Sequence, residues 1–402
     1  MSSFLHKSLC SAIALLSVAI LPVEGAPIFR SDFESGNGQN FLQIGENHFS
    51  FEFEKDTGSD DSQWFYFEVK AAKGETLTFD LLGVNDTNVP GHWKSAVPVV
   101  SNDGGTTWAR LTTKPERLED AFRFTHTLEA DTVRFAFHDP YTLTMIEADI
   151  ARWSTHPAAT LRSIGNSVEG RPIQLLSITD SSVPAAEKQG VWVTARQHSA
   201  EVTSSFTLAG FVDALLAEDE TGRALRKRFH VHIVPAANPD GIALGNYRDN
   251  ALGMNLNRLW DGSATLETAP EMVHIRREIR AWVDAGNNYS FYIDLHSTSG
   301  DEPHFAFHNN TKNTTPEYAA ELQRFLDLVE KHCPHFSAAT GLSSSMDRRF
   351  SDDSNWKEYG VKAWIFEGAY NNQNHGATPE AFMTPETHRA VGAAIARALV
   401  EF

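Results

Sequence analysis

The pattern of apolar and polar residues divides the chain into two parts that predict different folds. In the first part, short runs alternate between apolar and polar positions, with turn signals between them. The runs 64-WFYFEV-69 and 133-VRFAFHD-139 predict strands, and Asn-Asp-Gly-Gly at 102–105 predicts a hairpin. Short strands separated by turns are typical of two packed sheets. We therefore expect residues 26–155 to form an all-β sandwich domain, with β structure throughout.

From about residue 156 the rhythm changes, because short apolar runs now alternate with longer amphipathic stretches. The strand-like runs lie at 173–179, 191–195, 231–236, 291–296, 304–308 and 361–368, and the helical runs at 202–216, 271–284, 316–332 and 385–400. This alternation predicts an α/β layer fold with a largely buried sheet. We assign it to residues 156–402, after a joint near residues 154–157. Ligands in such folds bind where strands end and helices begin.

The first 25 residues predict a secretory signal peptide. Lys7 supplies a positive start, and residues 8–21 form an apolar segment that is too short to span a bilayer comfortably. Val23 and Gly25 then occupy the −3 and −1 positions of a cleavage point. We therefore expect a secreted or periplasmic protein with no membrane anchor after cleavage; a buried N-terminal helix is the competing interpretation.

Composition narrows the functional classes. The 402 residues are enough for two domains, and 41% of them are hydrophobic, so the chain can bury a large core. A net charge of −18 argues against a general nucleic-acid binder. After signal cleavage Cys333 is the single cysteine, so no internal disulfide is expected. We interpret Cys333 as a small buried hydrophobic residue rather than a reactive thiol.

Candidate chemistry begins with His198 and Glu201, directly after the predicted strand 191–195. A spacing of three lets both side chains point the same way from one helical turn. Both residue types are ordinary zinc ligands, and a catalytic zinc site usually has three protein ligands. His296, which ends the apolar run 291–296, is the best third ligand. The alternative for the first pair is a solvated helix start with its acid in the favourable first turn.

Other histidines are weaker ligand candidates. His230 and His232 alternate within a predicted strand, which is typical of strand packing or of exposure to solvent. His304 and His308 could line the mouth of a pocket instead.

Four further polar residues are candidates for catalysis and substrate binding. Glu367 ends the apolar run 361–368, where a carboxylate is costly to bury without a partner, so it marks either a site or the rim of the sheet. Arg248, Asn257 and Arg258 follow the turn predicted at 238–241. Arginines that point into a pocket clamp carboxylates by paired hydrogen bonds, whereas surface arginines would only be solvated.

The order of these motifs resembles that of the zinc carboxypeptidases of the funnelin (carboxypeptidase A-like) type. The motifs that carry the resemblance are H-x-x-E at 198–201, N-P-D-G at 238–241, Y-R at 247–248, N-R at 257–258, D-L-H at 294–296 and F-E-G at 366–368. The likeness covers roughly residues 160–400, and it implies a mixed β-sheet flanked by helices. The stretches 63-QWFYFEV-69 and 133-VRFAFHDPYT-142 look like the N-terminal sandwich of the cytosolic-carboxypeptidase branch.

The resemblance implies a role for each candidate residue. His198, Glu201 and His296 would hold one zinc ion, and Glu367 would act as the general base. Arg248 would steady the oxyanion of the scissile carbonyl. Asn257 and Arg258 would hold the free C-terminal carboxylate of a peptide substrate. We therefore expect a zinc-dependent metallocarboxypeptidase.

The sequence departs from digestive members of the family at three places. Ala200 stands where they carry an arginine directly before the ligand Glu, and Asn255 stands where they carry an aspartate that bonds the first zinc histidine. A neutral partner would make His198 a less basic ligand and weaken zinc binding. No tyrosine lies between Leu342 and Asn355, so we assign no catalytic tyrosine.

Side-chain specificity stays open at this stage. Arg348 and Arg349 in 346-MDRRFSDDS-354 would favour acidic C-terminal residues, whereas Asp352 and Asp353 would favour basic ones. Relatives in the cytosolic branch often remove glutamate, which favours acidic ends.

Two rival functions remain. A zinc-dependent amidase or deacylase that acts on cell-wall peptides or N-acyl amino acids would use the same ligands. A binding protein that kept the fold would be expected to have lost part of the ligand and base set, which is intact here.

Overall fold

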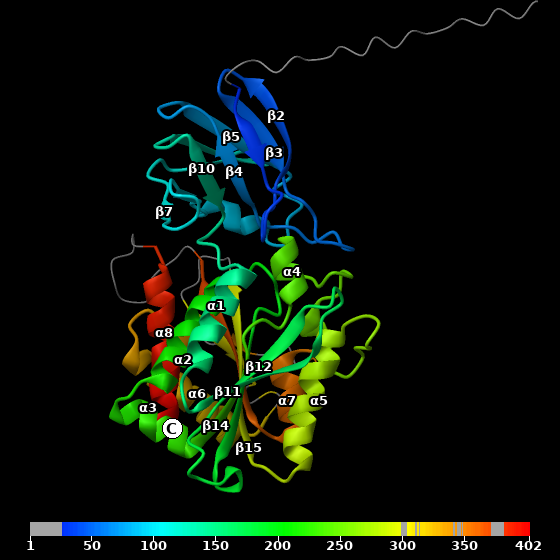
Figure 1. Cartoon of the computed structure of the whole chain (residues 1–402), viewed down its shortest axis with the longest axis vertical. Coiled ribbons are helices and arrows are strands. Elements are labelled where there is room, and N and C mark those ends of the chain that lie inside the picture. The colour runs from blue at the N-terminus through cyan, green and yellow to red at the C-terminus, as the bar shows by residue number, and fades with distance from the viewer. Residues whose placement is uncertain are drawn as a thin grey trace, which may run out of the picture.

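The computed structural model describes residues 26–298, 304–309, 312, 314–340, 342–343, 347, 349–370 and 382–402. The predicted signal peptide at 1–25 and Arg348 therefore lie outside the described residues. Figure 1 shows a β-sandwich at one end of the molecule and an α/β layer structure at the other.

The N-terminal part consists of two five-stranded sheets, ordered β1-β4-β10-β6-β7 and β2-β3-β5-β9-β8. The strands are β1 (Ile28–Arg30), β2 (Gln39–Gly45), β3 (His48–Glu52), β4 (Tyr66–Lys70), β5 (Thr76–Leu82), β6 (Val99–Ser101), β7 (Ala109–Arg110), β8 (Glu116–Arg117), β9 (Ala121–Thr127) and β10 (Thr132–Ala136). Phe51, Phe67, Phe79 and Phe135 are buried and pack ring against ring between the sheets. β6 pairs with β7 across the hairpin predicted at 102–105. The predicted sandwich is confirmed.

The expectation of β structure throughout this part is wrong at its end. Helix α1 (Leu143–Ser154) follows the sandwich, and Thr142 caps it by accepting a hydrogen bond from the Met145 N–H. Its buried positions, Leu143, Ile146, Ile150 and Trp153, recur every three or four residues, which is the period of an amphipathic helix.

The second part is built on one mixed eight-stranded sheet, ordered β11-β12-β14-β13-β15-β18-β16-β17. Its strands are β11 (Ala159–Asn166), β12 (Pro172–Ile178), β13 (Gln189–Ala195), β14 (Phe229–Val234), β15 (Tyr289–Thr298), β16 (Phe305–His308), β17 (Leu342–Ser343) and β18 (Lys362–Ala369). The four central strands, β14, β13, β15 and β18, run parallel. Their carboxyl ends meet at one edge of the sheet, where ligands bind in such folds.

Helices cover both faces of this sheet, so the expected α/β fold is confirmed. Figure 1 shows α2 (Thr203–Leu216), α3 (Glu220–Arg228), α6 (Pro316–His332) and α8 (Pro385–Glu401) on one side, and α5 (Pro270–Asp284) and α7 (Ser351–Tyr359) on the other. Cys333 is buried, as expected of a small hydrophobic residue. In the described part of the chain, no helix has the length and apolar character needed to cross a bilayer.

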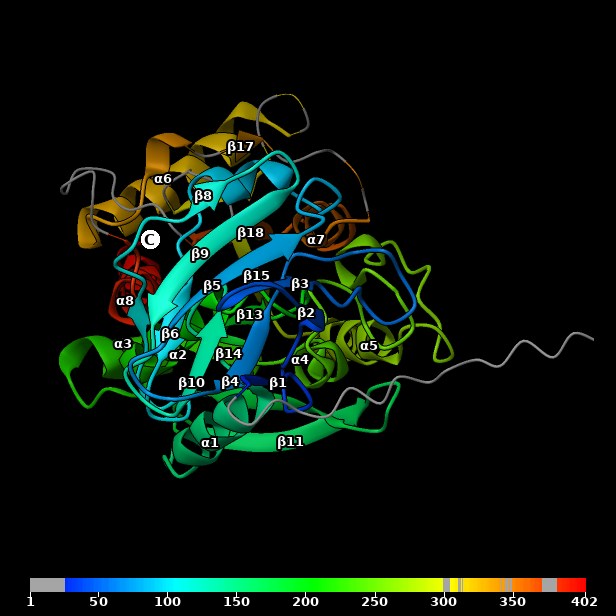
Figure 2. The same cartoon turned by 90° about the horizontal axis from the view of Figure 1, so that it is seen from above.

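The view from above places the sandwich strands across the end of the α/β sheet (Figure 2). Between the two parts lies α4 (Pro239–Leu244), a short helix where the sequence predicted only a turn. Asn238 starts this helix, because its side chain accepts a hydrogen bond from the Gly241 N–H. The sandwich contacts the loop that follows α4, which carries several of the candidate site residues.

Candidate active site

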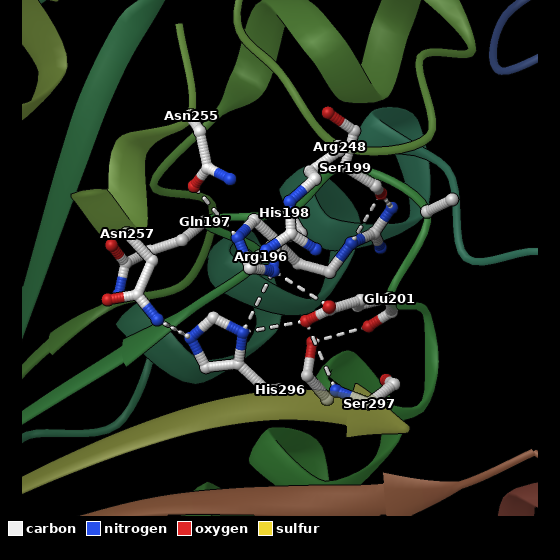
Figure 3. A network of polar contacts seen from close by, with 12 residues as sticks. Arg196, Gln197, His198, Ser199, Glu201, Arg248, Asn255, Asn257, His296 and Ser297 are labelled. Atoms are coloured by element: carbon white, nitrogen blue, oxygen red, sulfur yellow. Dashed lines mark hydrogen bonds and ion pairs between the residues drawn. The ribbon is translucent and has the colours of Figure 1, made fainter. Parts of the chain in front are cut away.

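Three predicted ligands converge at the carboxyl edge of the sheet. His198 and Glu201 lie between the end of β13 and the start of α2, and His296 lies in β15. His198 Nδ1 is 2.7 Å from Glu201 Oε1, and His296 Nδ1 is 2.7 Å from Glu201 Oε2. Figure 3 shows the three side chains pointing toward one another. The pair at 198 and 201 occupies the turn before α2, not a helical turn as the spacing predicted.

The arrangement fits a zinc ion. The two Nδ1 atoms are 3.2 Å apart, and ligand atoms of all three residues lie within 4.8 Å of one another. Two nitrogens bound tetrahedrally to zinc at about 2.0–2.1 Å would be about 3.3 Å apart. All three side chains are buried. A set of two histidines and one glutamate leaves a fourth position open, as catalytic zinc sites require.

The outward-facing nitrogens of the two histidines have different partners. His296 Nε2 lies 3.0 Å from Asp294 Oδ2, and this carboxylate also accepts hydrogen bonds from Thr194 and Ser351. His198 Nε2 lies 3.1 Å from Asn255 Oδ1. Asp294 was missed as a functional residue by the sequence analysis. The sequence does offer a signal for Asp294, because a lone carboxylate in a buried strand is the same feature that made Glu367 a candidate.

The protonation of the cluster follows from these surroundings. Burial, together with the nearby Arg248 cation, lowers the pKa of His198 to about 4, so its imidazole is neutral at pH 7. Burial also acts to lower the pKa of His296, but Asp294 and Glu201 outweigh it and raise that pKa well above its usual value. Burial acts to raise the pKa of Glu201, and the two histidines reverse this and hold the pKa below its usual range. Glu201 is thus a carboxylate, the form that binds a metal.

Glu367 stands beside His296 because of strand pairing. In the parallel register of β15 and β18, His296 is opposite Glu367 and Ser297 is opposite Gly368. Paired residues of neighbouring strands project from the same face of a sheet. Glu367 is half-buried. Burial, with repulsion from Glu201, raises its pKa to about 8. A bound divalent cation would lower this pKa by favouring the carboxylate.

The two predicted site arginines lie close to this cluster. Both are half-buried. The Arg248 cation acts on the pKa values of both His198 and Glu367. The Arg258 guanidinium lies over the Phe350 ring at 3.9 Å and donates to the Asn257 carbonyl at 2.7 Å. Burial and repulsion from Arg248 lower the pKa of Arg258 to about 10, so it stays cationic at neutral pH.

Asn257 is more enclosed than a free substrate ligand would be. Its side chain is buried, its Oδ1 accepts a hydrogen bond from the Ser351 N–H at 3.1 Å, and its Nδ2 lies 3.3 Å from His296 Nε2. The amide is thereby oriented by α7 and by β15. Its role toward substrate stays a prediction.

Arg196 is a second residue that the sequence analysis missed. It has a positive φ of 60°, which is uncommon for a non-glycine residue, and its side chain is buried. Its guanidinium donates to the Ser199 carbonyl, in the same turn as His198, at 2.9 Å (Figure 3). It also donates to the Tyr141 carbonyl at 2.8 Å. Arg196 therefore ties the turn that carries His198 to the start of α1. No sequence pattern signals this, because the contacts are to backbone carbonyls.

The remaining histidine candidates are structural. His304 and His308, for which a place at a pocket mouth was only one possibility, are buried and bond to the backbone at Ala369 and Asn309. His232 stacks on Trp192 with ring centroids 4.5 Å apart, which confirms strand packing.

The specificity residues that the structure describes fall into two groups. Arg349 is exposed and paired with Asp347, and its charge acts on Arg258. Asp352 and Asp353 are buried at the start of α7, where Asp353 Oδ2 is 2.6 Å from Lys357 Nζ.

Comparison with known proteins agrees with this geometry. Residues 147–359 match the zinc carboxypeptidase family, and residues 29–138 match the cytosolic carboxypeptidase N-terminal domain. An uncharacterized protein of Zymomonas mobilis is 31% identical over 78% of this chain and 78% of its own length. Human cytosolic carboxypeptidase 6 is 30% identical over 69% of this chain, and the aligned region spans 58% of the human protein.

Solved structures show the same fold. The metallo-carboxypeptidase of Burkholderia cenocepacia aligns with a TM-score of 0.84 at 24% identity, over 93% of this chain and 98% of that one. The metallo-carboxypeptidase of Pseudomonas aeruginosa, solved in complex with (2-guanidinoethylmercapto)succinic acid, aligns with a TM-score of 0.85 at 24% identity, over 93% and 98%. With more than half of its length matched to the family and its ligand cluster in place, the chain belongs to the zinc carboxypeptidases, in the form that carries a cytosolic-carboxypeptidase N-terminal domain.

Proposed function

We propose that this enzyme removes residues from the C-terminus of peptides that end in a free carboxylate, with one zinc ion and Glu367 as the general base. The observation that carries the proposal is the pair of half-buried arginines beside the ligand cluster. Burial is the main cause of the lowered pKa of Arg258, and repulsion from Arg248 lowers it further. An anion bound between them would relieve that repulsion, and a terminal carboxylate is the anion that distinguishes a C-terminal peptide bond from an internal one.

In this proposal the chain's own groups bind the substrate and move the proton. Arg258, oriented by Phe350 and by the Asn257 carbonyl, holds the terminal carboxylate. His198, Glu201 and His296 would hold a zinc ion, which would supply Lewis acidity toward a water molecule and the scissile carbonyl. Glu367 accepts a proton from that water and passes it to the leaving amine. Arg248 donates hydrogen bonds to the oxyanion that develops on the carbonyl.

Acidic C-terminal residues are the proposed preference. Asp353 is enclosed and paired with Lys357, so it cannot serve as an exposed partner for a basic substrate side chain. Arg349 is exposed and acts on the charge of Arg258 slightly more strongly than its partner Asp347, which acts in the opposite sense. This leaves a small positive potential on this side of the site.

Export from the cytoplasm is also part of the proposal. It rests on Lys7, the apolar segment at 8–21 and the cleavage point after Gly25. Expression of the full chain in a Gram-negative host, followed by fractionation and N-terminal sequencing, tests it. We expect a periplasmic or secreted chain that begins at Ala26. A cytosolic product that retains residues 1–25 would reject export.

The activity is tested with the chain from Ala26 onward and a mixed peptide library, with and without a zinc chelator. Mass spectrometry should show chelator-sensitive loss of single C-terminal residues, acidic ones fastest, and no trimming of amidated peptides. Equal trimming of free and amidated ends would reject the carboxylate clamp. Cleavage only at internal or non-peptide amide bonds would favour the amidase or deacylase.

The base is tested with Glu367→Gln, with Glu317→Gln on the exposed surface of α6 as the matched control. General acid–base catalysis contributes about 10²- to 10⁴-fold to rate, so kcat should fall by about that factor while zinc content stays unchanged. Full activity of Glu367→Gln would exclude Glu367 as the base.

A further inference from the structure

A loop contributed by the α/β part carries most of the candidate substrate residues, and the sandwich holds it in place. We call residues 245–258 the arginine loop, because Arg248 and Arg258 lie in it together with Asn255 and Asn257. Few of its residues belong to a helix or strand, so contacts to other parts of the molecule must fix its conformation. Several of these contacts come from residues nearly two hundred positions earlier.

Asp56, which follows β3 of the sandwich, makes the most direct contact. Its buried carboxylate accepts hydrogen bonds from three consecutive backbone N–H groups of the arginine loop: Tyr247 at 2.5 Å, Arg248 at 2.6 Å and Asp249 at 2.8 Å. Successive N–H groups that converge on one anion form a nest, and this requires a specific backbone conformation at each residue. One side chain of the sandwich therefore fixes the backbone from which the Arg248 side chain projects.

Neighbouring residues of the sandwich reinforce this contact. The Thr57 N–H donates to Asn246 Oδ1 at 3.2 Å, and Asn37 Nδ2 donates to the Gly245 carbonyl at 3.0 Å. Gly58 and Gly253 approach so closely that a Cβ on Gly253 would stand 2.4 Å from the Gly58 carbonyl oxygen. At Gly58 and Gly253 the sandwich and the arginine loop thus meet backbone to backbone, with no room for a side chain between them.

The side chain of Arg248 also meets the sandwich. Its Nε lies 4.0 Å from Asp61 Oδ2, and its cation acts on the pKa values of His198 and Glu367. Arg248 thus lies between an acidic residue of the sandwich on one side and the ligand cluster on the other. Its placement decides whether its hydrogen bonds reach a developing oxyanion.

We infer that Asp56 is a positioning residue for Arg248: the sandwich domain completes the catalytic site through the Asp56 carboxylate, with Asp61 as a second, weaker contact to the arginine side chain. This inference rests on the proposed role of Arg248 in stabilising the oxyanion. It assigns the N-terminal domain a part in the chemical step, beyond covering the end of the sheet. A misplacement of about 1 Å in a catalytic group can cost about a hundredfold in rate.

The test is a double-mutant cycle of Asp56→Asn and Arg248→Ala, measured on the chain from Ala26 with its zinc bound. Asparagine keeps the shape of Asp56 but turns an N–H₂ toward backbone N–H groups, so the nest loses one acceptor atom. We expect Asp56→Asn to lower kcat by about tenfold to a hundredfold, with a smaller change in KM and an unchanged zinc content. In the Arg248→Ala background the same substitution should have almost no further effect on kcat, because the group it positions is gone.

Ser35→Ala is the matched control at the same interface. The buried Ser35 hydroxyl donates to the Ile242 carbonyl in α4 at 2.8 Å, but it does not touch the N–H groups that Asp56 binds. It should lower the unfolding temperature while kcat stays at the parental value. If Asp56→Asn does not fold, the cycle is run with Asp61→Asn, at a half-buried position, which should lower kcat only when Arg248 is present.

The outcomes separate the inference from the proposed function. Full activity of Arg248→Ala would reject the oxyanion role itself. A large loss in Arg248→Ala with unchanged kcat in a folded Asp56→Asn would reject the positioning role alone. An equal loss of kcat from Asp56→Asn in both backgrounds would also reject it, because Asp56 would then act on general stability. If Asp61→Asn replaces Asp56→Asn in the cycle, an unchanged kcat, or an equal loss of kcat in both backgrounds, would reject the positioning role.

Discussion

The two sides of the ligand cluster are built differently, although each presents one histidine Nδ1 to the same glutamate. On the β15 side, His296 is backed by Asp294, a fully buried carboxylate that also bonds Thr194 and Ser351. On the turn side, His198 is backed by the half-buried amide oxygen of Asn255. One histidine therefore has a charged and rigidly held partner, whereas the other has a neutral partner on a loop.

The difference indicates that the two histidines would contribute differently to metal binding. A carboxylate behind a ligating histidine fixes its tautomer and increases its basicity, and an amide does so less strongly. We therefore expect His296 to hold a zinc ion more firmly than His198 does. His198, with the less basic ring, lies on the side of the arginine loop.

The largest expected contrast is in the protonation of the two histidines when zinc is removed. The pKa of His296 is raised by Asp294 and Glu201, and that of His198 is lowered to about 4. Nitrogen-15 NMR of the zinc-free protein at pH 6–7 should show a charged His296 and a neutral His198.

The two pKa values shift in opposite directions, so the two histidines stabilise the zinc-free fold over different pH ranges. His296 stabilises it at low pH, and this effect is lost as pH rises through the raised pKa of His296. His198 stabilises the fold above about pH 6.5 and loses this effect as pH falls toward 4. Two histidines that titrate together would break the contrast.

Removing the charge behind His296 should have the next largest effect. Mutation of such outer partners typically costs about 10- to 100-fold in metal affinity, so Asp294→Asn should raise the zinc dissociation constant by about that factor. Competition with a fluorescent zinc chelator measures it. Asn255→Ala is the matched change on the other side, and it should cost much less. Equal losses in the two variants would show that the two sides are equivalent.

The smallest effect is expected from giving His198 a carboxylate partner in place of the Asn255 amide. Asn255→Asp should raise the basicity of His198 and tighten zinc by up to about tenfold. The same chelator competition detects it, and kcat on free-carboxylate peptides shows whether activity changes with affinity. Unchanged or weaker zinc binding in Asn255→Asp would show that the neutral Asn255 amide does not limit how well His198 binds zinc.

Much of the α/β part could be predicted from sequence because its signals are local. The runs at 191–195 and 291–296 fall within β13 and β15, and the run at 361–368 overlaps β18 in all but its first residue. Apolar periodicity is enough to find such strands. His198, His296 and Glu367 could then be selected because each follows or ends a buried strand, where polar residues are costly unless they serve a site.

The parts that were missed depend on contacts between distant segments. Asp294 and Asp56 gain their roles from partners far away in sequence, and a lone aspartate does not reveal which groups will face it. Helix α1 was missed for another reason. Its helical period is present in the sequence, but the helix follows directly on a run of strands, and the change of pattern at residue 156 comes only after it has ended.

The pairing of β15 with β18 has one more consequence. His296, a proposed ligand, and Glu367, the proposed base, are direct neighbours across two parallel strands, so the sheet's repeat of about 4.8 Å sets their separation. A Cβ on Gly368 would stand 2.3 Å from Thr203 Oγ1, which seats the first turn of α2 tightly against this pair of strands. The spacing between His296 and Glu367 is therefore set by the pairing of the two strands and not by the loops. The loops around the site can therefore differ in sequence without changing the spacing between His296 and Glu367.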